Sequence, residues 1–315
     1  MKFFRGFAVA SVALGFAIAV LGSWVRINGA GLTCPDWPLC HGELVPSLHG
    51  GVVLEWSHRL VALLESFVVI GLIVSGIRER RRIAGVTPAL VALGVVFALQ
   101  VSLGGATVLL ANSPFSVMLH WAMAMALLGV LTILAVLAIL APAPHAAGAA
   151  RPNTGDGAAP ALAVAALLAF VTMCIGAYVS SSYAGLACLT FPACDGSLLG
   201  HGTAQLVQML HRIAAGSFAL VALVATWTAL GVSSTRVRAF ALTGCALVLV
   251  QIVLGFANVA WQLPLVLREA HAANAQLTFL TFVVAAVLAA LEPVAATLPA
   301  VERSAAGSQR IATNP

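Results

Sequence analysis

Four histidines stand inside apolar stretches of this 315-residue chain: His58, His120, His211 and His271. An ionisable side chain inside a membrane span is costly, so each of them needs a reason to be there. A single histidine near a membrane interface can simply hydrogen-bond a neighbour or a lipid headgroup. Four in a repeated pattern favour a second interpretation, in which neutral imidazoles on facing helices are metal ligands.

Two imidazoles from opposite helices are suited to haem iron, because they can clamp a porphyrin edge-on in the apolar core of a four-helix bundle. Zinc is the competing metal. It would need thiolate or carboxylate ligands in addition, and no such cluster lies at the same depth in both halves of the sequence. The pattern therefore predicts haem.

Arginines near the histidines favour the same interpretation. Arg59 and Arg212 directly follow His58 and His211, and Arg268 precedes His271 by three residues. Guanidinium groups bind carboxylates in a bidentate manner, and haem carries two propionates. The alternative for these arginines is ordinary contact with lipid headgroups.

The chain contains an internal repeat. The segment 22–34 realigns with 176–188, the segment 100–108 realigns with 251–259, and the intervals are 154 and 151 residues. At an interval of 153 residues His58 falls on His211, and the interval of 151 carries His120 onto His271. Repetition of a half-chain predicts two similar bundles that face each other.

Composition places the chain in a membrane. Hydrophobic residues make up 61%, charged residues 8%, and the mean hydropathy is +1.05. Apolar runs near the length of a bilayer span occur at 5–25, 54–77, 88–110, 116–140, 160–180, 206–230, 236–258 and 266–291. We therefore predict an all-α integral membrane protein whose eight transmembrane helices form two pseudo-symmetric four-helix bundles.

Charge gives the orientation and the domain plan. Eleven of the fifteen basic residues fall at the N-terminus, in every second connection or in the tail, which predicts that both termini are cytoplasmic. The net charge of +5 thus reflects topology and gives no reason to invoke nucleic acid. We expect an N-terminal bundle (1–140), a Pro/Gly-rich cytoplasmic linker (141–159), a C-terminal bundle (160–292) and a disordered cytoplasmic tail (293–315).

The repeat breaks beside the first histidine of each half. Glu55 stands three residues before His58, whereas Gln208 stands three residues before His211. A carboxylate beside a bound porphyrin can move protons or stabilise a developing cation, which predicts that the N-terminal half is the reaction chamber. The alternative is a buried glutamate satisfied by Arg59 or a loop amide. Three roles stay open for Glu65, two helical turns farther along: a proton-path residue, a helix-packing residue or a neutral buried acid.

Two cysteine pairs have identical spacing in the predicted outer loops, Cys34/Cys40 and Cys188/Cys194. Disulfides form and persist on the oxidising side of a membrane, so two disulfides that staple the loops are the simplest interpretation. A strained, exposed disulfide could also be redox-active. Attachment of c-type haem is disfavoured, because no Cys-x-x-Cys-His motif is present.

Together these residues resemble a known family. The segment 29–40, the motif 55–59 (Glu-Trp-Ser-His-Arg), His120-Trp121, His211-Arg212 and His271, in an eight-span repeated chain, are similar to the haem A synthases. The resemblance covers about residues 22–291. It implies oxidation of the C8 methyl group of haem O to a formyl group, which gives haem A for cytochrome oxidase. It also implies that His58 and His120 flank the substrate haem, that Glu55 is the catalytic carboxylate, and that His211 and His271 ligate haem b.

The resemblance further implies an inner-membrane location, lipid contact and, as partners, haem O synthase or cytochrome oxidase assembly factors; a homo-oligomer is compatible with it. Two other functions stay open on the residues alone. One is a di-haem membrane electron-transfer protein. The other is a haem carrier that binds the porphyrin and hands it over.

Overall fold

The structure, a computed structural model, describes residues 1–140 and 157–291. Within these ranges eight helices are long and apolar enough to cross a membrane: α1 (Lys2–Ile27), α2 (Gly50–Glu79), α3 (Val86–Leu109), α4 (Pro114–Leu140), α5 (Ala158–Ser181), α6 (Thr203–Leu230), α7 (Thr235–Ala260) and α8 (Leu265–Leu291). A short 3₁₀ turn, η1 (Ala184–Leu186), follows α5. The prediction of an all-helical protein with eight spans is confirmed.

The helices begin one to four residues before the predicted apolar runs. The extension has a simple physical reason. A chain in a bilayer must satisfy its backbone N–H and C=O groups internally, so the helix continues until its ends reach a polar environment. Apolarity marks only the part of each helix that is buried in lipid or protein.

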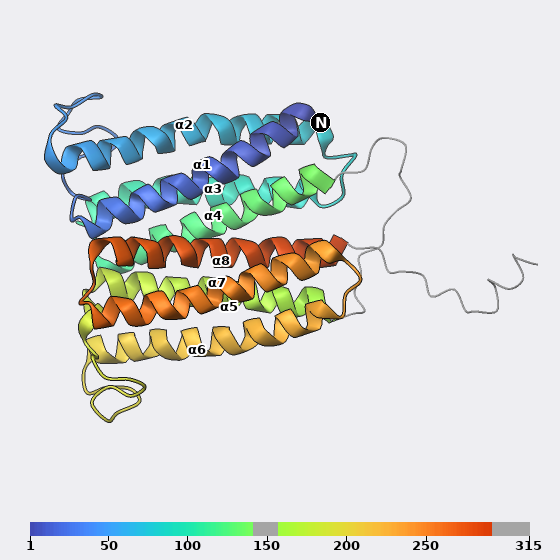
Figure 1. Cartoon of the computed structure of the whole chain (residues 1–315). Helices are drawn as coiled ribbons and strands as arrows, with labels where there is room; N and C mark the ends of the chain where they lie inside the picture. The colour runs from blue at the N-terminus through green and yellow to red at the C-terminus, as the bar shows by residue number, and fades with distance from the viewer. Residues whose placement is uncertain (141–156, 292–315) are drawn as a thin grey trace, which may run out of the picture.

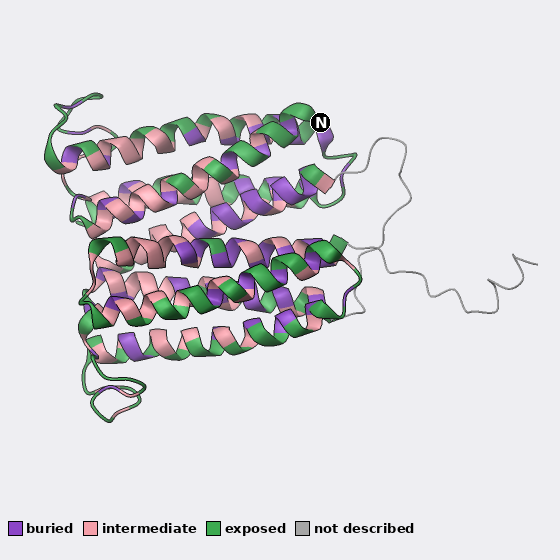
Figure 2. Ribbon diagram, viewed as in Figure 1, coloured by how far each residue is buried: buried purple, intermediate pink, exposed green. Residues whose placement is uncertain are grey.

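The two halves lie side by side with their helices roughly parallel or antiparallel (Figure 1). In the first half α1 packs against α2 and α4, and α3 packs against α4; in the second, α5 packs against α6 and α8, and α7 against α8. Across the halves α4 contacts α5 and α8, and α1 contacts α8. Helices α4 and α8 are therefore central, and Figure 2 shows many buried residues along both.

The two long loops, 28–49 between α1 and α2 and 182–202 between α5 and α6, lie at the same end of the helices, and the N-terminus lies at the other end (Figure 1). We call this loop-bearing end the loop end. The predicted tail and most of the predicted linker fall in 141–156 and 292–315, outside the described residues. The domain boundaries stay predictions.

Candidate functional site

Each of the four histidines lies near the loop end of an even-numbered helix and packs against a glycine of the helix before it. The pairs are His58 with Gly22, His120 with Gly104, His211 with Gly176 and His271 with Gly255. A methyl group added to these glycines would lie 2.8, 3.2, 2.9 and 3.4 Å, respectively, from Cε1 of the paired ring. The first and third of these distances are too short for any side chain. Glycine thus creates the space in which the ring sits between two helices.

The hydrogen bonding of these rings suits a metal ligand. The Nδ1 atoms of all four histidines are buried and have no hydrogen-bond partner within the described residues. A buried neutral imidazole with an unpaired ring nitrogen can offer that nitrogen's lone pair to a metal.

The histidines also interact in pairs within each half. His120 is close enough to His58 to interact with it electrostatically, and His271 interacts with His211 in the same way. The structure thus associates the members of each predicted pair, one from α2 or α6 and one from α4 or α8. Two buried imidazoles of this kind fit the two axial positions of a haem iron.

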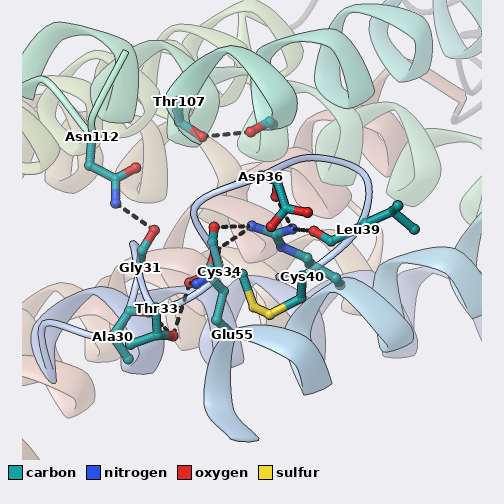
Figure 3. Close-up of polar contacts among 12 residues, drawn as sticks. Ala30, Gly31, Thr33, Cys34, Asp36, Leu39, Cys40, Glu55, Thr107 and Asn112 are labelled. Carbon is teal, nitrogen blue, oxygen red and sulfur yellow. Dashed lines mark hydrogen bonds and ion pairs between the residues drawn. A yellow bond between two sulfur atoms is a disulfide. The ribbon is translucent and has the colours of Figure 1, made fainter. Parts of the chain in front are cut away.

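Glu55 is buried, with 3% of its surface exposed, and its carboxylate ties α2 to the first long loop. Oε2 accepts hydrogen bonds from the Cys34 amide (2.9 Å) and the Thr33 hydroxyl (3.0 Å), and Oε1 accepts one from Arg59 Nη2 (2.5 Å; Figure 3). The structure therefore shows the loop-holding arrangement that was the alternative for this residue.

Gln208 makes the corresponding contact in the second half. Its Oε1 accepts a hydrogen bond from the Cys188 amide (2.6 Å), and its Nε2 donates to the Gly185 carbonyl (2.8 Å). An amide and a carboxylate thus hold the same loop position in the two halves. The two halves therefore differ at this position in one respect: the first has a carboxyl group and the second has an amide.

Arg59 and Arg212 are bound to the long loops. Arg59 donates to the carbonyls of Asp36 (2.7 Å), Leu39 (2.6 Å) and Cys34 (2.9 Å) in addition to Glu55. Arg212 donates to the carbonyls of Thr190 and Cys188, each at 2.6 Å. These bonds to the loops explain why an arginine directly follows each of the two histidines. A role for either guanidinium in binding a propionate stays a prediction. Propionate binding by Arg268 also stays a prediction. Arg268 lies near Arg26 of α1.

Both predicted disulfides are present, Cys34–Cys40 and Cys188–Cys194, and all four cysteines are buried. Each closed loop lays an aromatic ring over the third helix of its half. Trp37 lies over Gly105 of α3, where a methyl group would be 3.1 Å from the indole, and Phe191 packs edge-on against Phe256 of α7 with ring centres 4.7 Å apart. The disulfide loops therefore cover the loop end of both halves.

Sequence reasoning missed the four glycines and a polar contact near His271. The signal for the glycines was available, because Gly22 repeats as Gly176 and Gly104 repeats as Gly255 within the realigned segments. In the second half Asn274 donates to Gln251 Oε1 (2.7 Å), whose amide donates to the His271 carbonyl (3.1 Å). This contact joins α7 to α8 beside the histidine.

Fold and site define a class of protein: a multi-pass membrane protein that holds two pairs of histidines near the loop end of its bundles. Comparison with known proteins narrows the class. The family model COX15-CtaA, cytochrome oxidase assembly protein, matches residues 5–283. The chain belongs to this family, and it is an oxidoreductase of the haem A synthase type that handles haem.

Three relatives illustrate the similarity. The haem A synthase of Bacillus pumilus is 27% identical over 220 residues, which cover 68% of this chain and 71% of that protein. The haem A synthase of Shewanella oneidensis is 26% identical over 307 residues, covering 84% and 90%. That of Staphylococcus carnosus is 24% identical over 280 residues, covering 82% and 87%. The similarity extends over both halves of the chain.

Proposed function

We propose that this protein converts haem O to haem A, with the reaction in the N-terminal half and a b-type haem in the C-terminal half. The observation that carries the proposal is the matched pair of histidine sites, each ring set against a helix glycine with its Nδ1 unbonded, of which one has a carboxylate and the other an amide as neighbour. The relatives are named haem A synthases, which supports haem O as the substrate.

In the N-terminal half His58 and His120 would hold the substrate from the two faces of its ring. Glu55 stands one helical turn before His58 on the same face of α2, so it can receive a proton released near the ring edge. The bonds from Cys34, Thr33 and Arg59 hold its carboxyl group against the first long loop. The covering loop excludes water from the reacting methyl group.

In the C-terminal half His211 and His271 would ligate haem b. A b-type haem, when bound, supplies one-electron transfer. The residues of this half would bind and orient the haem. Gln208, an amide, stands here in the place that Glu55 has in the first half. Gln251, whose Oε1 accepts a hydrogen bond from Asn274, donates to the His271 carbonyl, which ties α7 to α8 and would hold the second ligand in place.

The proposed orientation places the loop end outside the cytoplasm and both termini inside, in the cell membrane, because basic residues gather at the other end of the helices. Disulfides at the loop end are consistent with an oxidising compartment. A haem O synthase or a cytochrome oxidase assembly factor is the kind of partner that would supply the substrate or receive the product.

The test is expression of the whole chain with a source of haem O, followed by extraction of the bound haems and mass analysis. The proposal expects haem B together with haem O or haem A, and formation of haem A over time. Two haem B groups with no conversion would instead show an electron-transfer protein. Haem O bound but never oxidised would show a carrier.

A further inference from the structure

Glu65 is a buried carboxyl group that the proposed reaction does not use. It lies on α2, seven residues after His58, so two helical turns place it on the same face and roughly 10 Å farther from the loop end. Only 4% of its surface is exposed, and both carboxylate oxygens lack a partner among the residues that the structure describes. A buried carboxyl group without a hydrogen bond is costly, so it indicates a ligand that the group serves.

The carboxyl group points into the N-terminal bundle. A methyl group added to Gly15 of α1 would lie 3.8 Å from Oε1 of Glu65, and 3.3 and 3.5 Å from Leu128 and Leu131 of α4. Gly15 is itself two turns from Gly22, the glycine beside His58. These four residues, Gly15, Glu65, Leu128 and Leu131, form what we call the N-terminal floor, because they lie beyond the histidines as seen from the loop end.

The corresponding positions of the second half contain larger, apolar side chains. The repeat places Ala169, Phe218, Phe279 and Phe282 there, and all four are buried. Phe218 and Phe282 meet edge-on with ring centres 5.9 Å apart, and Phe279 packs against Phe170 at 6.2 Å. This C-terminal floor is filled by aromatic rings, whereas the N-terminal floor has two leucines, a glycine and an unbonded carboxyl group.

The two haems of the proposed function differ in one substituent that suits this difference. Haem B carries a vinyl group where haem O carries a hydroxyethyl group extended by a long isoprenoid chain. Both haems carry two propionates, and the C8 methyl group shares a pyrrole ring with one of them. If the propionates faced the polar loop end, the hydroxyethyl group, on the opposite side of the ring, would be directed deeper into the bundle.

We propose that Glu65 binds the hydroxyl group of the haem O side chain, so that the N-terminal floor selects haem O while the aromatic C-terminal floor admits haem B alone. This inference rests on the proposed function. The carboxyl group can accept or donate the hydrogen bond, and the glycine and two leucines around it are apolar neighbours that suit the start of the isoprenoid chain. Removal of a buried partner for a substrate hydroxyl reduces discrimination strongly, because the polar group of the ligand is then left unpaired.

The experiment compares Glu65→Leu, Glu65→Gln and the control Phe67→Leu, an exposed position of the same helix, in the full chain, each checked by size-exclusion elution. Kinetics of haem A formation give KM for haem O and kcat separately. Titration of each variant with haem O and with haem B, in a Glu55→Gln background that prevents turnover, gives the ratio of the two dissociation constants.

We expect Glu65→Leu to raise KM for haem O roughly tenfold or more with little change in kcat, and to reduce the preference for haem O over haem B by the same factor. Glu65→Gln should keep most of the preference, because an amide also hydrogen-bonds a hydroxyl group. Phe67→Leu should leave KM for haem O unchanged.

Two results would overturn the inference. One is an unchanged KM and an unchanged preference in Glu65→Leu. The other is an equal loss of kcat in Glu65→Leu and Glu65→Gln at constant KM, which would make Glu65 a proton-transfer group. In both cases the wild type still forms haem A, so the proposed function survives; absence of haem A from the wild type would refute the proposed function itself.

Discussion

Arg26 of α1 donates a hydrogen bond from Nη2 to Oγ of Ser180 in α5, and Ser180 is the residue that the repeat places opposite Arg26 in the second half. The contact joins the halves near the loop end. Arg26 also interacts electrostatically with Arg268 of α8. Two guanidinium groups, together with the Glu269 carboxyl group that interacts with Ser23 of α1, thus lie where α1 meets α8 between the halves.

Arg268→Gln tests this region. Of the three arginines predicted to bind propionates, Arg59 and Arg212 are bound to loop carbonyls. Arg268 lies instead near Arg26, between the halves. We expect its loss to weaken haem binding roughly 10- to 100-fold, as removal of a charge-assisted hydrogen bond does. Titration of the purified variant with haem B measures the change. Equal weakening by Val266→Gln, an exposed position nearby, would show a general effect and contradict the assignment.

Glu55→Gln removes the carboxyl group but keeps an oxygen that can hold the first long loop. Gln208 shows that an amide at this position can accept the hydrogen bond of the loop cysteine, so the variant should keep its fold and still bind haem. We expect haem A formation to fall roughly 100- to 10,000-fold, the usual contribution of a general acid or base. Pigment analysis of membranes that contain a haem O source gives the yield. Undiminished haem A in this variant would end the catalytic role of Glu55.

Alanine variants of the histidines separate the two sites. His211→Ala or His271→Ala should abolish the low-spin b-type absorption spectrum, because each removes one of two axial ligands. His58→Ala or His120→Ala should chiefly remove product and leave that spectrum. Spectra of the four purified variants decide the matter, and an unchanged spectrum in both C-terminal variants would refute the division of roles.

Gly22→Ala should displace the His58 ring, since the added methyl group would meet Cε1 at 2.8 Å. Overpacking of this kind costs about 1–3 kcal/mol, and we expect haem A formation to fall at least roughly tenfold. Gly176→Ala should shift the b-type spectrum in the same way. Gly6→Ala in the same helix as Gly22 is the control, because nothing lies within 4 Å of its added methyl group. Equal activities of the Gly6 and Gly22 variants would contradict the proposed ring position.

Acid should loosen the first long loop selectively. The backbone amides of Gly42 (2.8 Å) and His41 (2.6 Å) donate to the Asp36 carboxylate and hold its pKa below the usual range. A lowered pKa means that the stabilisation is present at neutral pH and is lost as the pH falls through the lowered pKa, below about pH 4. The second loop has Thr190 at this position, whose hydroxyl accepts from the Asp195 amide (3.0 Å).

The measurement for this prediction is the rate at which a phosphine reductant opens each disulfide at pH 3 and at pH 7, followed by mass analysis. We expect Cys34–Cys40 to become more accessible at the lower pH relative to Cys188–Cys194. Asp36→Asn should remove most of that pH dependence. Equal acceleration of both disulfides in the wild type would show that Asp36 does not hold its loop.

Much of the architecture could be predicted because it depends on local composition. A run of about 20 apolar residues has few alternatives to a membrane helix, and a repeat interval carries one histidine onto another without knowledge of distance. The cysteine spacing likewise matched the disulfides that the structure contains. Helix ends were predicted less well, since they depend on where the backbone meets a polar environment.

The sequence by itself determined the membrane class, the eight spans, the duplicated histidines and the exchange of Glu55 for Gln208. Only the tertiary structure decided what each polar side chain bonds. Arg59 and Glu55 hold a loop that is distant in sequence, four glycines make room for the rings, and Glu65 faces Gly15 without a hydrogen-bond partner in 1–140 and 157–291. The reason is physical. Apolar span patterns are properties of consecutive residues, whereas a hydrogen bond or a steric contact between two helices depends on their rotation and depth, which packing of the whole bundle sets.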